Sequence, residues 1–258
     1  MNATRDIHAR TVSEGWLEAV KALLMTPSHS ALHFAVRIAE PAAPENSAIR
    51  AVADRLLKHG HLQEIKSVRN TIFPAVWAQR FPDPCELAEH YLEHYPTLRR
   101  FPKNRDGTYF GRLVAYPMSG NGDGDTFDQL TDLVRKLRAE SSVKAGGRRA
   151  RRLSSRYEVN IWKPGDLPSG MGFPCMAHMS FHLVSGTLHL LAQYRNQYLI
   201  ERAYGNYLGL AQLQQYVAIA VGLAPGELMI LASHASLDTH GDVGLSAIRA
   251  ALADLPPP

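Results

Sequence analysis

One stretch of the sequence combines a thiol, a cation and a carboxamide that could act together on a small molecule. Cys175 is one of two cysteines in the chain and precedes two apolar segments, after which Arg195 and Asn206 follow. A cysteine attacks as the thiolate, and a neighbouring cation lowers the thiol pKa. Arginine also binds phosphate, and an asparagine side chain both donates and accepts hydrogen bonds. These residue types suit covalent catalysis on a phosphorylated ligand with an amide-like edge.

Each of these residues also has an ordinary structural role. A cysteine beside an apolar strand is more often a packing residue, an arginine is usually on the surface, and an asparagine before a helix is usually an N-cap. Their joint spacing is what favours a site. The other cysteine, Cys85, precedes a helical segment, and we expect it to be structural. A helix N-terminus could lower its pKa, but no partner base is evident.

The elements that must position these residues are two strands and a long helix. Residues 179–184 and 187–195 are predicted strands on either side of a Ser185-Gly186 turn, because apolar and polar residues alternate in them. Residues 208–222 are mostly apolar, which is typical of a helix buried in the centre of a fold, and Gly222 suits its end. Further strands are predicted at residues 33–39, 157–162 and 227–233, and further helices at residues 13–24, 47–60, 86–95 and 126–140.

These elements predict an α+β fold, with a mixed or mainly antiparallel sheet and helices packed on it. In the helix at 126–140, Thr126 and Gln129 match a capping box, and an apolar stripe follows. The stripe consists of Phe127, Leu130, Val134 and Leu137. Residues 40–47 and 119–125 are predicted connections, and neither marks a domain boundary, so we expect a single domain over residues 1–258.

The composition is that of a soluble globular protein. The chain is 45% hydrophobic and 20% charged, and no run approaches the roughly 18 apolar residues of a membrane helix. The first residues lack the apolar core of a secretory signal, and two cysteines make no disulfide framework. We therefore expect no membrane partner and a reducing, cytoplasmic setting.

The charge is modestly positive, with a net value of +4 and a pI of about 9.1. This balance suits an anionic ligand. Much of it comes from the basic run at residues 144–152, which a solvated loop explains. No aromatic residues alternate with the basic ones, so we expect no nucleic-acid partner.

The arrangement around the thiol resembles the thymidylate synthase family. That family places Pro-Cys before a strand hairpin with a Gly turn, ends the second strand with Arg, and opens a long buried helix with Asn. Here these residues are Pro174-Cys175, Gly186, Arg195 and Asn206, at the family spacing without gaps. The resemblance is good over residues 155–233.

Further matches are more scattered. The family's Trp-Asn-x-Gly-Glu-Leu pattern is matched upstream by Trp162, Gly165, Asp166 and Leu167. Asp128-Gln129 is similar to an Asp-Gln pair before a family helix, residues 107–111 faintly resemble a Tyr-Gly loop of the family, and residues 222–228 fall where the family has a Gly-rich turn. The resemblance is weak over residues 70–140 and nearly absent before that, so residues 1–69 form a divergent N-terminal part.

The resemblance implies a thymidylate synthase-like fold and folate-dependent one-carbon transfer, methylation or hydroxymethylation, to C5 of a pyrimidine nucleotide such as dUMP. Cys175 would add to C6 of the ring and make C5 nucleophilic. Arg195 and Asn196 would bind the phosphate, and Asn206 would hydrogen-bond N3 and O4 of uracil. The implied cofactor is 5,10-methylenetetrahydrofolate.

The resemblance also implies a symmetric homodimer, because family members lend an arginine pair to the partner's phosphate site. Arg156 matches the second arginine of this pair, and Ser155 stands at the first. Arg151 or Arg152 lies close enough in the sequence to substitute for it.

Several family positions carry other residues here. Asn196 replaces a phosphate-contacting serine, and Tyr198 replaces an aspartate on the folate side. Ser236 and Asp238 stand where the family has its sugar-binding His and Tyr, although His234 lies close. Sugar recognition is therefore open, and a ribonucleotide is an alternative substrate.

The family's catalytic glutamate has no match either. Its helix aligns best with residues 70–77, where Asn70 or Thr71 takes its place and Pro74 disfavours a continuous helix. No glycine-rich phosphate loop is found near the N-terminus. The family also continues, past the point where this chain ends, to a segment that closes over the folate. Its absence favours a hydroxymethyl product, because water would then reach the reactive one-carbon unit.

Three functional hypotheses remain open. The first is the one-carbon transferase, and the second is a homologue that binds a nucleotide without turnover. In the third, Cys175 serves another electrophile or a structural role. No metal site is expected, because His178 and His182 would lie about 13 Å apart on a strand and His59 and His61 flank a helix end.

Overall fold

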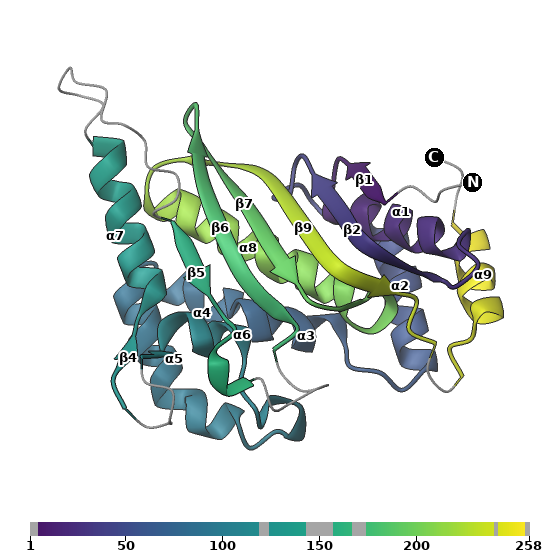
Figure 1. Cartoon of the computed structure of the whole chain (residues 1–258), viewed down its shortest axis with the longest axis horizontal. Helices are drawn as coiled ribbons and strands as arrows, with labels where there is room; N and C mark the ends of the chain where they lie inside the picture. Colours follow the sequence, from purple (N-terminus) through teal and green to yellow (C-terminus); the bar gives the residue numbers. More distant parts are fainter. Residues whose placement is uncertain (1–4, 119–123, 143–156, 167–173, 240–241, 256–258) are drawn as a thin grey trace.

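The computed structural model describes residues 5–118, 124–142, 157–166, 174–239 and 242–255. Within these ranges the chain forms a seven-stranded sheet in the order β1-β2-β9-β7-β6-β5, with β8 paired to β9 off this path (Figure 1). Its strands are β1 (Asp6–Ala9), β2 (Ser30–Ile38), β5 (Glu158–Asn160), β6 (Met176–Val184), β7 (Thr187–Tyr194), β8 (Gln197–Tyr198) and β9 (Ala224–Ser236). A second, small sheet joins β3 (Tyr116–Pro117) and β4 (Thr126–Phe127).

The helices pack mainly on one face of the sheet. They are α1 (Val12–Leu24), α2 (Ser47–His59), α3 (Ile65–Ile72), α4 (Ala75–Arg80), α5 (Pro84–Leu98), α6 (Tyr109–Val114), α7 (Gln129–Ser142), α8 (Tyr204–Ala220) and α9 (Leu245–Ala253), with the short turns η1 (Pro102–Asn104) and η4 (Pro164–Asp166) and the π-helix η5 (Leu199–Ala203). In Figure 1, α1 and α8 lie behind β2, β9 and β7. No helix in the described residues is long and apolar enough to cross a membrane.

The sheet is mixed, which confirms the predicted α+β class. β1 is parallel to β2, and β9 is parallel to both β7 and β8. The pairs β2–β9, β6–β7 and β5–β6 are antiparallel. β9 is the central strand, and its pairing with β7 and β8 places the ends of both strands beside the candidate site.

The β6–β7 hairpin turns at Ser185 and Gly186, as the sequence predicts. Both residues have positive φ, 50° and 90°, and Val184 pairs with Thr187. Two positive φ angles match the twist of an antiparallel pair, and glycine adopts this conformation without strain. At the open end of the hairpin, the backbone N–H of Arg195 donates to the carbonyl of Cys175 at 2.9 Å. The hairpin itself therefore brings the backbones of the candidate nucleophile and cation together.

α8 is the buried helix that the sequence predicts. Every residue from Tyr204 to Ala211 is buried. The helix ends as expected at Gly222, whose φ is 70°. The N–H of Gly222 bonds to the carbonyl of Ile219 at 3.1 Å and that of Leu223 to Ala218 at 2.9 Å, which is the Schellman pattern.

Two glycines allow α3 to lie close to the start of α8. A Cβ on Gly205 would be 2.7 Å from the Cβ of Val68, and one on Gly209 would be 2.8 Å from the Cβ of Ile72. Both separations are shorter than real carbon–carbon contacts, so any larger residue must push the helices apart. This close approach places α3 beside the candidate site.

We expect Gly205→Ala to lower the free energy of unfolding by about 1–3 kcal/mol, because the added methyl group overpacks the α3–α8 contact. Urea denaturation monitored by circular dichroism measures this loss. Gly244→Ser is the control, because its position is open and is the N-cap of α9, where serine is favoured. An equal loss in both variants would contradict the packing argument.

The helix predicted at residues 126–140 begins later than expected. Thr126 and Phe127 form β4 and pair with β3, so α7 begins at Gln129. The predicted capping box is therefore wrong, and Asp128 caps the helix instead. The side-chain amide of Gln129 bonds to the backbone N–H and carbonyl of Asn160. Phe127 is exposed and does not belong to the buried stripe.

Two other helical predictions are refined. A break at Pro74 separates α3 from α4, as the proline predicts. α5 is longer than residues 86–95, because the side chain of Asp83 accepts hydrogen bonds from two backbone N–H groups and starts the helix at Pro84.

Candidate active site

Cys175 and Asn206 line one pocket, although they come from different elements. The pocket has a volume of about 340 Å³, which lies within the range of small-ligand sites. Its walls come from the start of β6, from β8, η5 and α8, from α3, and from the segment that leads into α6. Asn196 also lines the pocket, so three of the predicted site residues meet there.

The thiol of Cys175 is half-buried, and two opposing effects set its pKa. Burial raises the pKa of this thiol, whereas the positive charges of Arg195 and Arg202 lower it. Arg195 therefore favours the thiolate as expected, but burial outweighs it, so the net shift is upward and the thiol is the resting form. Arg195 is exposed and is not among the residues that line the pocket, and its Nε donates to the carbonyl of Pro174 at 3.0 Å.

Two buried carboxamides face the pocket. Asn206, in the first turn of α8, is 4% exposed. Gln197 on β8 is 2% exposed, and its Nε2 has no hydrogen-bond partner among the described residues. A buried amide nitrogen without a partner is costly, so a ligand carbonyl is its natural acceptor. The sequence did not point to Gln197, because its burial depends on the pairing of β8 with β9.

Tyr109, at the start of α6, is a further pocket residue that the sequence did not single out. Its phenol oxygen lies within hydrogen-bonding reach of the backbone N–H groups of Cys175 and Met176. Burial raises the pKa of this phenol above its ordinary value. Tyr109 is therefore a neutral hydroxyl group beside the thiol. The only sequence signal was the faint likeness of residues 107–111 to a family loop.

A charged group closes one side of the pocket. The carboxylate of Glu201 lies 3.0 Å from Arg202 Nη2 and 3.8 Å from Lys103 Nζ, and its side chain is only 12% exposed. Arg202 also donates to the side-chain oxygen of Gln63 at 2.6 Å. These contacts hold a carboxylate at the pocket wall, at a place other than the family glutamate position.

The structure decides between the two residues expected at that glutamate position. Thr71 lines the pocket, and its hydroxyl donates to the carbonyl of Val68 at 2.7 Å. Asn70 does not line it, and its side-chain oxygen accepts from Arg69. A threonine hydroxyl does not ionise at neutral pH, so this wall lacks the negative charge of the family.

Of the residues that align with the sugar and phosphate positions of the family, some line the pocket and others lie behind it. Asn196 Oδ1 lies 2.6 Å from His234 Nδ1, as in a hydrogen bond that the imidazole N–H donates. His234 therefore does not line the pocket itself but orients the side chain of Asn196, which does. Ser236 pairs with Tyr198 across β9 and β8, and only Tyr198 of this pair lines the pocket.

Asp238 does not reach the pocket, which corrects its alignment with a sugar-binding residue. It is 4% exposed, and its two carboxylate oxygens accept from the backbone N–H groups of Ile200 and Glu201, both at 2.8 Å. It thus holds the start of the π-helix that carries Glu201. Burial raises the pKa of Asp238 to about 6, although these hydrogen bonds oppose the shift.

This raised pKa predicts a pH-dependent stability. The folded state favours the protonated carboxyl group, so its contribution is fully present below about pH 4 and is lost as pH rises through about 6. We expect the free energy of unfolding of the wild type, relative to Asp238→Asn, to fall by about 2 kcal/mol between pH 4 and 7. Urea denaturation at each pH measures it. Asp254→Asn, an exposed aspartate paired with Arg55, is the control, and a pH-independent difference for Asp238→Asn would contradict the assignment.

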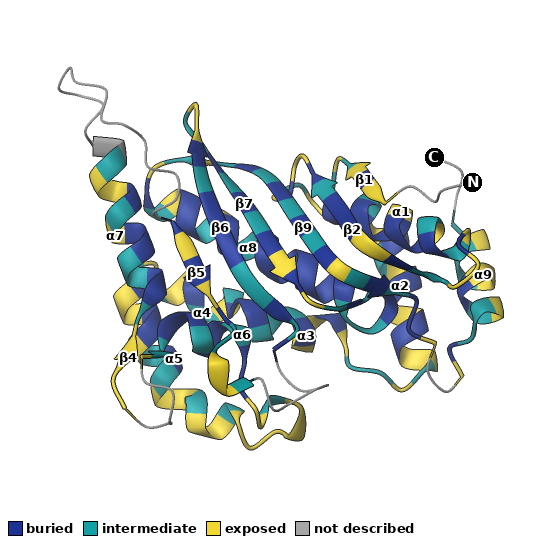
Figure 2. Cartoon of the chain, viewed as in Figure 1, coloured by how far each residue is buried: buried dark blue, intermediate teal, exposed yellow. Residues whose placement is uncertain are grey.

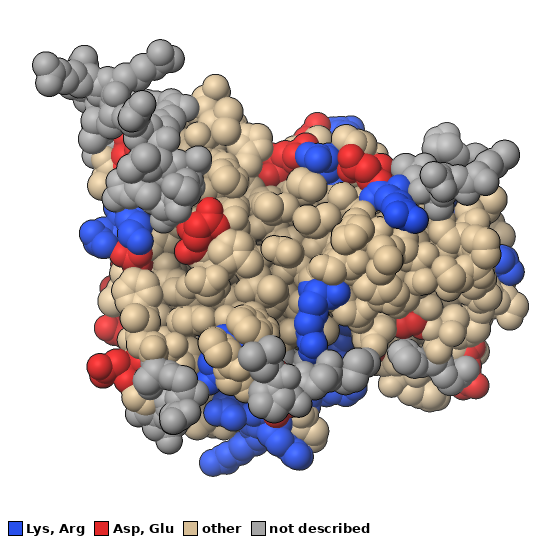
Figure 3. Space-filling model, viewed as in Figure 1, with Lys and Arg blue, Asp and Glu red and all other residues tan. Residues whose placement is uncertain are grey.

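Basic side chains gather beside the pocket, along the lower edge of the view in Figure 3. They belong to the segment between α5 and α6, which carries Arg99, Arg100, Lys103 and Arg105. This positive edge suits an anionic ligand. Arg156 and the basic run at 144–152 lie outside the described residues, as do Ser155, Leu167 and His240.

Cys85 is exposed at the start of α5 and is unlike Cys175. Desolvation first, and then the negative charges of Glu89, Asp128 and Asp83, raise the pKa of the Cys85 thiol, which also donates a hydrogen bond to Glu89. The proposed lowering by the helix N-terminus is therefore wrong. His178 lies on β6 with its ring bonded to Glu158 and Asn160.

Comparison with known proteins agrees with the geometry. A family model described as thymidylate synthase matches residues 71–241, which is more than half of the chain. The matched range contains all the residues that line the pocket around Cys175 except Val68, and it begins just after the part expected to be divergent. No curated protein matches the chain significantly.

Proposed function

Because the chain belongs to the thymidylate synthase family, we propose that it transfers a one-carbon unit to C5 of a pyrimidine nucleotide through a covalent adduct of Cys175. The family supports this class of reaction. The observation that carries the proposal in this chain is that Cys175 and Asn206 converge on one pocket beside a positive edge.

In the proposed reaction, the sulfur of Cys175 forms a bond to C6 of the pyrimidine, and the displaced electron pair makes C5 nucleophilic. The side chains of Asn206 and Gln197 donate hydrogen bonds to the base and stabilise the negative charge that develops on its oxygen. Tyr109 is a neutral hydroxyl group beside the sulfur, which suits it to hold the attacking atom in place.

The raised pKa of Cys175 means that a proton must leave the thiol when the reaction begins. Tyr109 cannot take it, because its phenol is already protonated. Glu201 is a carboxylate held in the pocket wall by Arg202 and Lys103. We assign proton transfer to Glu201, acting through water, in place of the family glutamate.

The phosphate would bind at the rim. Arg195 and Asn196 form the junction between β7 and β8, and Asn196 lines the pocket; a guanidinium group binds phosphate in a bidentate manner. Arg156 remains the proposed contribution from the partner subunit. A ribose hydroxyl would meet Asn196, which His234 orients, rather than Asp238.

The mouth of the pocket fits 5,10-methylenetetrahydrofolate in its chemistry. Tyr198 offers an aromatic surface, and Asn104 and Asp106 offer hydrogen-bond partners for a pterin edge. Lys103 and the neighbouring Arg105 offer positive charge for the glutamate tail. When bound, this cofactor supplies the one-carbon unit, and we propose that these residues hold it.

The front of the sheet supports a homodimer. Leu191 on β7 pairs with Met229 on β9, and Leu231 lies two residues further along the same face. All three side chains are partly exposed. Figure 2 shows no described helix over this part of the sheet. An uncovered apolar sheet face is typical of a protein interface.

We expect light scattering of the purified chain to give twice its 28.5 kDa mass. Leu231→Glu should give the monomer mass, because it buries a charge in the proposed interface. Ile219→Glu is the control, since Ile219 is an exposed apolar residue on α8, on the other side of the sheet. A monomeric wild type, or a dimer that tolerates Leu231→Glu, would refute this interface.

The test of the reaction is tritium release from dUMP, UMP, dCMP and CMP labelled at C5, each with and without 5,10-methylenetetrahydrofolate. Release requires addition at C6 and loss of the C5 proton, so it does not presuppose the product. We expect release from one nucleotide, and mass spectrometry of that reaction then distinguishes methyl from hydroxymethyl. Nucleotide binding without release from any substrate would refute the transferase and favour the binding homologue.

A further inference from the structure

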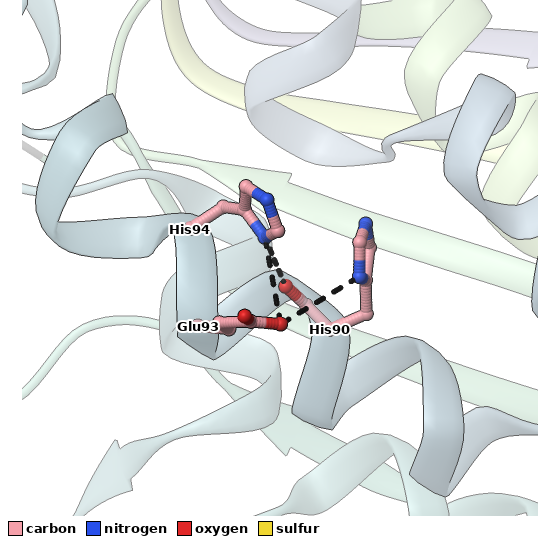
Figure 4. Close-up of side chains that lie close together, drawn as sticks. All are labelled: His90, Glu93 and His94. Atoms are coloured by element: carbon pink, nitrogen blue, oxygen red, sulfur yellow. Dashed lines mark hydrogen bonds and ion pairs between the residues drawn. The ribbon is translucent and has the colours of Figure 1, made fainter.

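Three side chains of types that bind metals lie together on α5, away from the pocket around Cys175. His90, Glu93 and His94 are spaced i, i+3 and i+4, so they share one face of the helix. One donor atom from each lies within 4.8 Å of the others. Figure 4 shows dashed lines from one oxygen of the Glu93 carboxylate to a nitrogen of each imidazole ring. The expectation of no metal, which rested on other histidine pairs, did not consider this group.

Aromatic packing restrains both imidazole rings. The ring of His90 stacks on Phe81 with centroids 4.3 Å apart, and Trp77 contacts His90 and His94 at 5.0 and 5.3 Å. His94 Nδ1 lies 2.9 Å from the carbonyl oxygen of His90, and a bound ion must displace this hydrogen bond to reach that nitrogen. Restrained side chains lose little conformational entropy when they bind an ion. This pair of histidines is therefore better suited to bind one than an equally spaced pair on a helix without such packing.

The donor set selects a class of ion. Two imidazoles and one carboxylate are ligands that Zn²⁺ and its neighbours accept, with an open position for water. Mg²⁺ and Ca²⁺ prefer sets made entirely of oxygen. The group on α5 therefore suits a borderline-soft divalent ion.

The distances need only a small adjustment. Glu93 Oε2 lies 4.0 Å from Nδ1 of both His90 and His94. Ligand atoms about 2.1 Å from one tetrahedral ion are about 3.4 Å apart. The side chain of Glu93 is 75% exposed, so its carboxylate can move by that amount without disturbing the core.

The position on α5 gives such an ion a structural consequence. Pro96 lies inside the helix and has no N–H to bond to the carbonyl one turn earlier, which weakens this part of α5. The segment that follows the helix supplies Lys103 and Asn104 to the pocket mouth. An ion bound by both His90 and His94 would stabilise the helical turn just before Pro96.

We propose that His90, Glu93 and His94 bind one Zn²⁺-class divalent ion, which braces the C-terminal half of α5. The protein supplies three ligands, and water completes the coordination. This site is independent of the reaction at Cys175.

The experiment titrates the untagged, chelator-treated full chain with Zn²⁺ by calorimetry, and with Co²⁺ by visible absorption, which reports the coordination geometry. We expect one ion per chain and no heat from Mg²⁺ at the same concentration. A Zn²⁺ concentration one hundredfold above its Kd should raise the Tm by about 5–10 °C.

His94→Gln and His90→Gln should each weaken Zn²⁺ binding at least about tenfold. Glu93→Gln tests the same site at an exposed position where folding is not at risk. The matched control is His8→Gln, because His8 is an exposed imidazole 3.4 Å from the carboxylate of Asp6.

Circular dichroism without metal first confirms that each variant is folded. The proposal is overturned if the wild type takes up no Zn²⁺. It is also overturned if binding is unchanged in His94→Gln and Glu93→Gln, or if His8→Gln weakens it equally.

Discussion

Replacing Cys175 with serine should lower C5-tritium release by at least about a thousandfold, because a hydroxyl is far less acidic than a thiol and cannot provide an equivalent nucleophile. Serine has nearly the same shape as cysteine, so the pocket should still bind the nucleotide with little change in Kd. Single-turnover release measures the first effect, and calorimetry measures the second.

Cys85→Ser is the matched control for this variant. Cys85 is exposed on α5 and lies outside the residues that line the pocket, so release should not change. Retained release in Cys175→Ser would refute the covalent mechanism. Loss of both release and binding would show instead that serine disturbs the pocket.

The second large effect is expected at Asn206. Asn206→Leu keeps the branching and the number of heavy atoms of the side chain but removes its hydrogen bonds from a buried wall of the pocket. We expect kcat for release to fall about 100- to 1,000-fold, because the lost donor faces charge that develops only as the adduct forms. KM should change much less. Steady-state release over a range of nucleotide concentrations separates the two constants.

Gln215→Leu also replaces a carboxamide with leucine, at an exposed position of the same helix. It should leave both constants unchanged. If Asn206→Leu raised KM and left kcat intact, its side chain would contribute to ground-state binding alone. In that case we would assign the stabilisation of the developing negative charge to Gln197 instead.

Expectations that rest on local patterns agree best with the structure. The Ser185-Gly186 turn follows from alternation on either side of it and from the conformational freedom of glycine. The end of α8 at Gly222 has the same local origin. The helix predicted from Thr126 failed, because pairing with β3 draws that residue into a strand. Non-local pairing of this kind leaves little trace in a short window of sequence.

The site residues divide in a similar way. The spacing of Cys175, Arg195 and Asn206 is visible in the sequence because one hairpin and one helix carry all three. Gln197 and Glu201 were missed, although they lie in the same stretch, because no family motif marks either position and both are unremarkable residue types. Their roles come from burial and from partners such as Lys103 and Arg202.

The sequence by itself determined the hairpin, the buried helix and the meeting of Cys175 with the backbone of Arg195, because short-range periodicity and turn chemistry specify them. Only the tertiary structure decided that the Cys175 thiol is protonated at rest and that Asp238 supports the π-helix rather than the ligand. Burial and the distances between charges depend on chain segments far apart in the sequence, and these two quantities set the pKa values.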